Sequence, residues 1–439
     1  MKLHSAPYLV YKKSNSEWGE EIPEEWAEKR VKDLFRLVTD LAPKNNDYEL
    51  LSLYTSIGVK PRKDMEEQRG NKSVTTDDYW IVKKDDIIIN KLLAWMGAIG
   101  LSNYDGVTSP AYDILRKKRQ NKPEVDERFF TYLFRTEKAK QIFKRHSRGI
   151  MDVRLRLYFD KLGAITVPVP EYFVQKAIAD YLDNHTAQID RKIDLLNQKA
   201  QKYAELNQAL IKETVTRGLD QSAPLKNSGV DWIGQIPVHW TTERIKNVSK
   251  IFNGATPKSG VAEYWDGDYA WVTPDDLGKL STKYILQTKR TLTQAGFDNC
   301  GTSLCPKGSI VISSRAPIGY IGILDIDSCT NQGCKTLVLN QRLANNVYIF
   351  YVLLTAKREL ETLGKGTTFI ELSTKELSQF TFPLPPLEEQ KLIVAYLGTK
   401  TAHIEKIIAT ITTEIEKLRE LRNSLINDVV TGKIKVYQA

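Results

Sequence analysis

The chain repeats itself once, and this duplication constrains its fold more than any other feature. At an offset of 214 residues, eight residues near the start coincide with identical residues in the middle, and two of the eight are tryptophans. At an offset of 215, the segment 168–189 matches the segment 383–404 in the same way. Such a fixed offset indicates two copies of one unit. The eight matched residues are Lys12, Ser14, Trp18, Ile22, Pro23, Trp26, Arg30 and Lys32 in the first copy and Lys226, Ser228, Trp232, Ile236, Pro237, Trp240, Arg244 and Lys246 in the second.

The end of each copy has the pattern of a long helix. The segment 171–217 contains neither Pro nor Gly, and the matching segment of the second copy contains one glycine after Pro386. Apolar residues recur every seven positions in both segments, which predicts that the two helices pair as an antiparallel coiled coil. We expect the helices over 171–218 and 386–432. The predicted seam consists of Leu182, Ile189, Leu196, Tyr203 and Leu210 in the first helix and Leu397, Ile404, Ile411, Leu418 and Leu425 in the second.

The segments between these ends are mixed α and β and differ between the copies. Short β-rich runs occur at 50–54, 86–90 and 112–115, with counterparts at 269–273, 309–313 and 336–339. The two copies share the order of these β-rich runs but differ in their side chains. This pattern favours one fold that is used for two different tasks. The sequence therefore predicts an α+β protein in which each of two mixed α/β domains is followed by a long helix. The expected segments are an N-terminal extension over 1–17, a first domain over 18–170, a linker over 219–231, a second domain over 232–385 and a tail over 433–439.

Composition and motifs narrow the function classes. The chain carries 63 Lys and Arg against 54 Asp and Glu, a net charge of +9, which permits a polyanionic partner. No apolar run approaches the roughly 18 residues of a membrane span, no apolar stretch of a signal peptide follows the N-terminus, and four cysteines favour a reducing cytoplasm. The two Cys-x4-Cys pairs of the second domain fit buried thiols better than zinc ligands, so no metal is expected. No phosphate-binding P-loop and no Asn-Pro-Pro-Tyr motif occurs, which disfavours an ATPase, a methyltransferase or a fused enzyme.

Basic residues cluster with glycines and aromatics in both domains. Contacts with duplex DNA need Lys, Arg and backbone amides on phosphates, and Arg, Asn or Gln on base edges. The segment 364–368, before an expected helix, could bind phosphate through amides and hydroxyls. Each cluster taken alone also fits a solvated charged loop. The candidate DNA contacts are Lys60, Arg62, Lys63, Arg69, Lys72, Arg145, Arg148, Arg154 and Arg156 in the first domain and Lys258, Arg315, Lys365, Thr367 and Thr368 in the second.

These features together resemble the specificity subunit of a type I restriction–modification system, over nearly the whole chain. The resemblance rests on two Trp-x(3)-Ile-Pro-x(2)-Trp motifs, beginning at Trp18 and Trp232. It rests equally on two Pro-x-Pro segments followed by Gln-x(2)-Ile-x(2)-Tyr-Leu, in which the glutamines are Gln175 and Gln390, and on the Val-Thr pair at each helix end. Each motif is weak alone, but their order and duplication are specific.

The resemblance implies that each mixed domain is a target recognition domain for one half of a split double-stranded DNA site. The helix pair then sets the spacer between the half-sites and docks two modification subunits, which use S-adenosylmethionine. Restriction/translocase subunits, which use ATP and Mg, join them in the cytoplasm. The chain itself would have no catalytic residue and bind no cofactor. Two other readings stay open, a stand-alone bipartite DNA-binding protein and a coiled-coil scaffold that does not bind DNA. A homodimerising coiled coil without a spacer role is a third possibility for the helices.

Overall fold

The structure is a computed structural model that describes residues 7–55, 57–65, 76–118, 125–149, 155–366 and 370–436. The chain divides into two compact units, and each unit takes a part of both long helices. The first unit consists of Met1–Leu196 and Thr413–Ala439, and the second consists of Asn197–Thr412. Each unit therefore contains one mixed α/β domain, called a head below, the near part of one long helix and the far part of the other.

In each unit a short antiparallel pair of strands, called the strap below, precedes the head. The strap leads into a strand that pairs with the last strand of the head. In the first unit β3 pairs with β12, and the Trp18 indole donates a hydrogen bond of 2.9 Å to the carbonyl of Thr166. In the second unit β15 pairs with β24, and Trp232 donates at 3.2 Å to Thr381. These equivalent bonds explain why the tryptophans recur. The straps and closing strands are β1 (Tyr11–Lys13), β2 (Glu21–Pro23), β3 (Ala27–Arg30) and β12 (Thr166–Val169) in the first unit, and β13 (Leu225–Asn227), β14 (Gln235–Pro237), β15 (Thr241–Arg244) and β24 (Thr381–Leu384) in the second.

The first head is built on a four-stranded antiparallel sheet of order β4-β11-β8-β9. Two further strand pairs, β5 with β6 and β7 with β10, lie beside it. The strands are β4 (Phe35–Val38), β5 (Leu51–Tyr54), β6 (Gly58–Pro61), β7 (Trp80–Val82), β8 (Ile87–Asn90), β9 (Ile99–Leu101), β10 (Gly106–Thr108) and β11 (Tyr112–Lys117). The helices are α1 (Val31–Leu34), η1 (Arg62–Asp64), η2 (Ala94–Met96), α2 (Glu127–Phe134), α3 (Glu137–His146) and α4 (Phe159–Leu162).

The second head repeats this plan with additions. Its main sheet has the order β16-β23-β20-β21-β18. A separate three-stranded sheet has the order β19-β17-β22. The strands are β16 (Ser249–Asn253), β17 (Trp265–Val272), β18 (Tyr284–Ile285), β19 (Arg290–Leu292), β20 (Ile310–Ser313), β21 (Ile321–Leu324), β22 (Ser328–Thr330) and β23 (Cys334–Leu339). The helices are α6 (Ile245–Val248), η4 (Ala262–Tyr264), α7 (Pro274–Gly278), α8 (Gln294–Asp298), α9 (Asn346–Thr355), α10 (Lys357–Thr362) and α11 (Thr374–Gln379).

The six β-rich runs expected from the sequence are confirmed as strands. They correspond to β5, β8 and β11 in the first head and to β17, β20 and β23 in the second. The central strands β8 and β20 occupy the same position, because each pairs in antiparallel fashion with the strand that precedes the helical part of its head. Three of the four residues of β8 and all four of β20 are buried, as a central strand covered on both faces requires.

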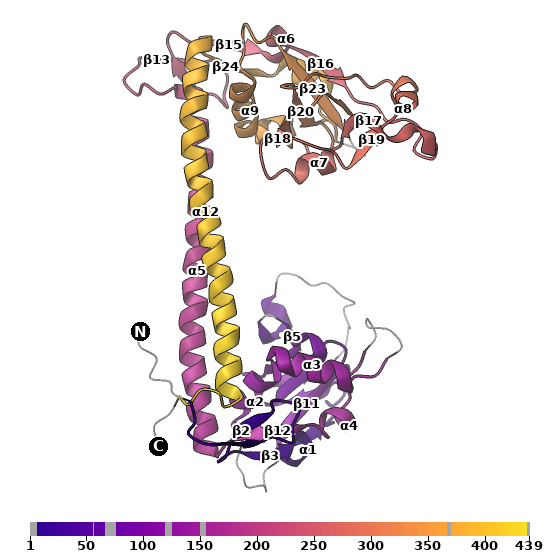
Figure 1. Cartoon of the computed structure of the whole chain (residues 1–439), viewed down its shortest axis with the longest axis vertical. Coiled ribbons are helices and arrows are strands. Elements are labelled where there is room, and N and C mark those ends of the chain that lie inside the picture. The colour runs from indigo at the N-terminus through magenta and orange to yellow at the C-terminus, as the bar shows by residue number, and fades with distance from the viewer. Residues whose placement is uncertain are drawn as a thin grey trace. The chain divides into compact units, whose positions relative to one another are not determined.

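The long helices are α5 (Tyr172–Arg217) and α12 (Leu387–Val430), and in each unit their parts run side by side and antiparallel (Figure 1). In the first unit Lys192 forms an ion pair of 2.8 Å with Glu414, and Asp190 forms one of 2.9 Å with Arg422. The ten seam residues expected from the heptads are all buried or half-buried in the structure. This placement is the one that a heptad seam predicts.

The end of α12 closes the first unit by packing on its strap. Gly432 has a φ of +76°, and a Cβ added there would lie 2.5 Å from Pro23 Cδ and 3.3 Å from Trp26 Cη2. The Tyr11 hydroxyl also donates a hydrogen bond of 3.2 Å to the carbonyl of Gly432. At the end of α5, Gly218 has a φ of +77° and lies against Trp240 in the same way. These two glycines occupy equivalent positions of the repeat. Each ends a long helix and leaves room for a tryptophan side chain.

Candidate nucleic-acid interface

The first group of candidate DNA contacts lies on the β5–β6 hairpin and the short helix η1. Lys60 extends from β6 with its Nζ 6.0 Å from the centre of the Tyr104 ring. Arg62 is half-buried at the start of η1, whereas Lys63 is exposed. Lys63 forms a hydrogen bond and ion pair with Glu49, which raises the pKa of the lysine. Strand β6 and helix η1 therefore present three cations within four residues of the chain. Arg69 and Lys72 lie outside the described residues.

The second group lies where the chain leaves α3. The backbones of Arg148 and Arg156 form an antiparallel bridge through two hydrogen bonds of 2.9 Å, and both side chains are exposed. The structure thus brings together two stretches that are separated in sequence. Arg145 instead forms an ion pair of 2.9 Å with Glu17. Arg154 lies outside the described residues.

In the second head the candidate cations are held by carboxylates. Arg315 is exposed and pairs with Glu371 at 3.0 Å. Lys365 pairs with Glu376 at 2.8 Å, and hydrogen bonds from Lys365 and Ser373 lower the pKa of Glu376 to about 2. These acids restrain the cations without burying them.

The remaining candidates of the second head differ in placement. Lys258 is exposed on a loop after β16. The helix expected directly after the 364–368 segment begins only at Thr374, and Ser373 caps it by accepting a hydrogen bond of 3.1 Å from the amide of Glu376. The amide of Lys365 is occupied by the carbonyl of Glu371 at 3.1 Å. Thr367 and Thr368 lie outside the described residues.

One buried charge differs in sign between the two heads. Asp113 on β11 is paired in register with Ile89 of β8, and Lys335 on β23 is paired in the same way with Ile312 of β20. Asp113 lies 3.5 Å from Lys91, and burial raises the pKa of its carboxyl. Both charges are almost completely covered, so each must be matched by its own set of partners.

Lys335 is matched by groups that the first head lacks at this position. Its Nζ lies 3.1 Å from the side-chain oxygen of Asn253 and 3.6 Å from Glu371, and burial lowers its pKa. The Glu371 carboxylate also holds Arg315, so a buried and an exposed cation share one acid. The two heads therefore share a framework and differ in the charges built into it.

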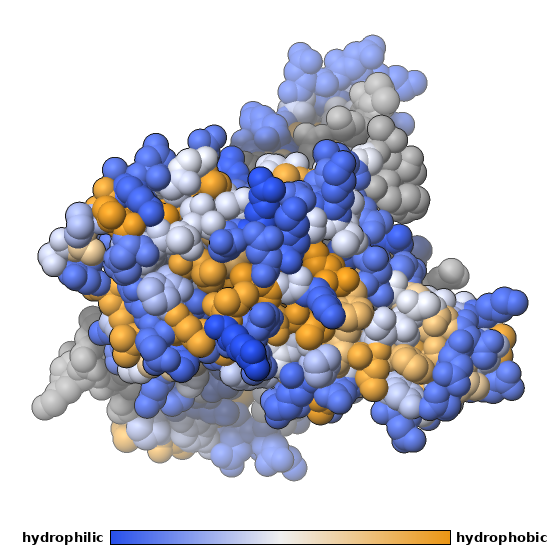
Figure 2. Space-filling view, turned by 90° about the horizontal axis from the view of Figure 1, so that it is seen from above, coloured by the Kyte–Doolittle hydropathy of each residue, from blue (hydrophilic) through white to orange (hydrophobic). Residues whose placement is uncertain are grey.

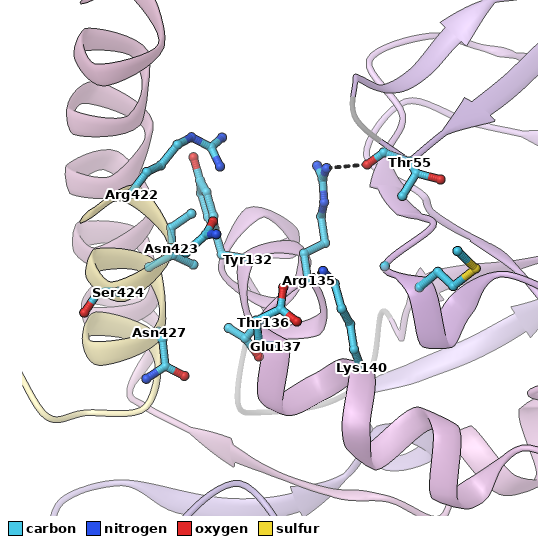
Figure 3. Close-up of a pocket in the computed structure, with 13 residues that line it drawn as sticks. Thr55, Tyr132, Arg135, Thr136, Glu137, Lys140, Arg422, Asn423, Ser424 and Asn427 are labelled. Atoms are coloured by element: carbon cyan, nitrogen blue, oxygen red, sulfur yellow. Dashed lines mark hydrogen bonds and ion pairs between the residues drawn. The ribbon is translucent and has the colours of Figure 1, made fainter. Parts of the chain in front are cut away.

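The first unit also contains a cationic groove between its head and its part of α12 (Figure 3). The groove has a volume of about 390 Å³ and continues into a second hollow of about 240 Å³ beside the β5–β6 hairpin. Tyr132, Arg135 and Arg422 line both hollows. Figure 3 shows Arg422 reaching from α12 toward Tyr132, while Arg135 turns toward the hairpin and bonds to Thr55.

Neither arginine of this groove was among the sequence candidates. Arg135 follows the buried run that ends α2, and the sequence there resembles an ordinary helix terminus. Arg422 lies between the seam residues Leu418 and Leu425, in a heptad position that normally faces the partner helix. A charged residue at an inward heptad position was the one available signal of this groove.

Exposed apolar side chains recur on the long helices at equivalent positions of the repeat. Leu206 on α5 is 53% exposed and Leu421 on α12 is 55% exposed, and the two residues are 215 positions apart, as the repeat requires. The second unit carries further apolar surface, with Leu392 at 63% and Val238 at 49% exposure. Figure 2, which views the molecule from the end at which α12 begins, shows apolar residues gathered among polar ones on this face. A contiguous apolar patch is typical of an interaction surface, whereas a single exposed apolar residue is common on any protein.

The described residues contain neither a metal-binding cluster nor a membrane-spanning helix. No group of three or more His, Cys, Asp or Glu side chains in the described ranges could hold a metal ion. None of the helices in those ranges combines the length and the apolar character needed to cross a bilayer. The four cysteines are free thiols, and burial raises the pKa of three of them, Cys305, Cys329 and Cys334.

The fold places the chain in a class of proteins built from two repeated units, each with a mixed α/β head beside paired segments of two long helices. Comparison with known proteins identifies the family within this class. The chain matches the family described as type I restriction modification DNA specificity domain twice, over residues 23–202 and 237–417. These two matches cover most of the sequence, and the chain therefore belongs to this family.

Individual relatives agree with this assignment. The putative type I restriction enzyme MjaX specificity subunit of Methanocaldococcus jannaschii is 27% identical over 97% of this chain and 98% of its own length. The MjaIX specificity subunit of the same organism is 35% identical, but only over 38% of this chain and 39% of the relative.

Solved structures share the fold. A chain from a type I R-M system, studied for its complex assembly and conformational transition, superposes with a TM-score of 0.74 at 17% identity, covering 94% of this chain and 99% of that one. The HsdS subunit from Thermoanaerobacter tengcongensis superposes with a TM-score of 0.54, also at 17% identity, over 94% of this chain and 98% of its own.

Proposed function

We propose that this protein is the DNA specificity subunit of a type I restriction–modification enzyme, in which each head reads one half of a bipartite double-stranded DNA site. The observation that carries the proposal is the pair of heads with one framework and opposite buried charges. Asp113 and Lys335 occupy the same register position, yet one is an acid and the other a base. One framework with different internal charges fits two heads that read different sequences better than two copies of one structural part.

The surface chemistry of both heads suits DNA. Exposed cations on loops can bind phosphates, and the polar groups among them can contact base edges. Arg148 and Arg156 in the first head and Arg315 and Lys365 in the second are such cations, and all four are exposed. We propose the same contact with DNA for Lys258, which is exposed on its loop, and for the candidates outside the described residues.

In this proposal the long helices set the distance between the two half-sites. Helix α5 runs without interruption for 46 residues and joins the first head to the strap of the second. A continuous helix of about 1.5 Å rise per residue is a stiff connector, so its length fixes the unread spacer. Two heads on such a connector act at high effective concentration and multiply their specificity.

The exposed helix leucines are the proposed docking points for two modification subunits. Leu206 and Leu421 stand at equivalent repeat positions, so two copies of one partner would meet the same local surface. The modification subunits would bind S-adenosylmethionine and methylate adenine, and restriction/translocase subunits would add ATP- and Mg-dependent cleavage. The present chain would supply no catalytic group and act in the cytoplasm beside the chromosome.

Methylation sequencing of the source genome, with and without this gene, tests the proposal. Loss of one bipartite N6-methyladenine motif on deletion, and its return on complementation, is the expected result. A methylome that retains every motif, in cells where the modification genes are expressed, would overturn the proposal. Binding of the purified chain to DNA over a salt series then separates the two remaining readings, because a scaffold shows no salt-dependent affinity and a stand-alone reader binds tightly without partners.

A further inference from the structure

The cationic groove of the first unit contains two guanidinium groups that lack a shared acid. Arg135 is half-buried and donates a hydrogen bond of 3.0 Å to the backbone carbonyl of Thr55. Arg422 pairs through Nε with Asp190 at 2.9 Å, which leaves the terminal nitrogens of its guanidinium facing the groove (Figure 3). Burial lowers the pKa of Arg135, and the charge of Arg422 lowers it further. The two arginines thus repel each other across a half-desolvated space.

Two other cations around the groove, Lys140 and Arg128, are already paired with acids. Lys140 is bound to Glu137 at 2.6 Å. Arg128 is bound to three aspartates, Asp126, Asp180 and Asp183, at 2.7 to 2.9 Å. Within the described residues, Arg135 therefore carries a charge that no carboxylate pairs with, and Arg422 is paired only through Nε, with Asp190. An anion seated between them would relieve their repulsion and accept charge-assisted hydrogen bonds from both.

The second unit has the same local framework without this charge. The N-terminal residues of α2 and α9 correspond, so Tyr132 matches Tyr351 and Arg135 matches Leu354. The hydroxyls of the two tyrosines contact equivalent threonines of the long helices. Arg422 corresponds at the repeat offset of 215 to Asn207. The shared framework therefore does not depend on either arginine, and the pair is a feature of the first unit.

We infer that Arg135 and Arg422 hold a backbone phosphate of the DNA on the helix side of the first head. The inference rests on the proposed function and adds to it a sequence-independent contact that only one half of the molecule makes. The groove leads to DNA rather than to another anion, because its second hollow is lined by Lys60 and neighbouring residues of the hairpin proposed to contact DNA. A strand that touches Lys60 can continue along this hollow to the arginine pair.

The test uses the full-length chain in complex with its modification subunits and a fluorescent duplex that carries the motif found by methylation sequencing. The variants are Arg422→Asn and Arg135→Leu, singly and together, which install the residues that the second unit already tolerates at these positions. For the double variant we expect affinity about threefold to tenfold weaker, on specific and unrelated duplexes alike. The slope of log affinity against log salt should fall in magnitude by about one, as for the loss of one phosphate contact.

Three measurements make the result decisive. Lys199→Gln, which removes an exposed cation of α5, is the matched control and should change neither affinity nor slope. Asn207→Arg with Leu354→Arg should give the second unit the same contact and restore the slope. Unchanged affinity and slope in a double variant that stays folded by circular dichroism would overturn the inference while leaving the methylated motif, and hence the proposed function, intact.

Other outcomes also decide the question. Loss of partner binding, with unchanged DNA binding by the remaining chain, would show that the pair holds an acidic group of the modification subunit instead. Stabilisation of the wild-type chain alone by inorganic phosphate at millimolar concentration, without any change of DNA affinity in the double variant, would assign the groove to a small free anion and exclude the DNA contact. Absence of any specific binding by the wild-type complex would count against the proposed function itself.

Discussion

Gln175 and Gln390 make the same two buried connections in the two units. Each side-chain oxygen accepts a hydrogen bond from the first residue before a head helix, from the amide of Asp126 at 3.0 Å and from that of Asn345 at 2.8 Å. Each side-chain nitrogen donates to a proline carbonyl before a long helix, at 2.8 and 2.9 Å. One buried amide thus fixes the start of a head helix against the start of a long helix.

Replacing either glutamine by methionine should destabilise its unit. Gln175→Met leaves the amide of Asp126 and the carbonyl of Pro170 buried without a partner, at a cost of about 1–3 kcal/mol. Gln390→Met should cost a similar amount in the second unit. Urea unfolding followed by circular dichroism measures the effect, and Gln198→Met on the exposed face of α5 is the control. A change below about 0.5 kcal/mol for both variants would mean that the clamp is dispensable.

Lengthening both helices should lengthen the DNA spacer. Seven residues inserted after Leu196 and seven after Thr412 fall at the boundary between the units and preserve the heptad register. The added length of about 10 Å corresponds to roughly three base pairs, so methylation sequencing should reveal the same half-sites about three base pairs further apart. Insertion of four residues in each helix is the control, because it breaks the register of the seam. Altered half-sites would contradict the spacer role.

Single substitutions on the long helices should remove modification subunits one at a time. Leu206→Asp and Leu421→Asp each place a charge on one exposed apolar site, and each should weaken one docking event by about 2 kcal/mol or more, roughly thirtyfold. Native mass spectrometry of the assembled complex should then count one modification subunit instead of two, and none for the double variant. Gln208→Asp adds the same charge to an exposed polar position of α5 and should leave two subunits bound. An unchanged count in the double variant would exclude this docking face.

The free energy of unfolding at acidic pH should depend on Glu376. The pKa of this carboxyl is lowered to about 2 by hydrogen bonds from Lys365 and Ser373, so its folded pKa lies below its unfolded one. Its contribution is therefore present above about pH 4.5 and is lost as the pH falls toward 2. Chemical unfolding of Glu376→Gln should show lower stability than the wild type at pH 6, and the difference should disappear near pH 2. Glu416→Gln on the exposed face of α12 should follow the wild type at both pH values, and a difference for Glu376→Gln that persists at low pH would refute the assignment.

The repeat and the helices could be predicted because their evidence is local. Tryptophans, glycines and heptads recur at fixed offsets, and the helices begin and end within a few residues of the expected positions. The strands were predicted as segments, but their order was not. β11 lies between β4 and β8 because of pairings between distant parts of the chain, and no local pattern encodes such pairings.

Sequence analysis could propose only local basic clusters as candidate DNA contacts, and these stay predictions. Runs of Lys and Arg such as Lys60, Arg62 and Lys63 are visible in any sequence, and the structure shows which of them an acid restrains. The groove was not predicted because Arg135 and Arg422 lie in distant parts of the sequence, and only the return of α12 to the first unit joins them. The opposite charges of Asp113 and Lys335 were likewise hidden, because their equivalence depends on strand register.

The contact of Gly432 with Trp26 and Pro23 determines the order in which the protein can be completed during synthesis. All parts of the second unit have been translated once residue 412 has left the ribosome. The first unit, although it begins the chain, must wait for 413–439, since these residues fill its core with Ile426, Val429 and Val430. The half that is made first therefore finishes folding last, and a ribosome that stalls in the final helix releases a chain with one finished reader and one open core.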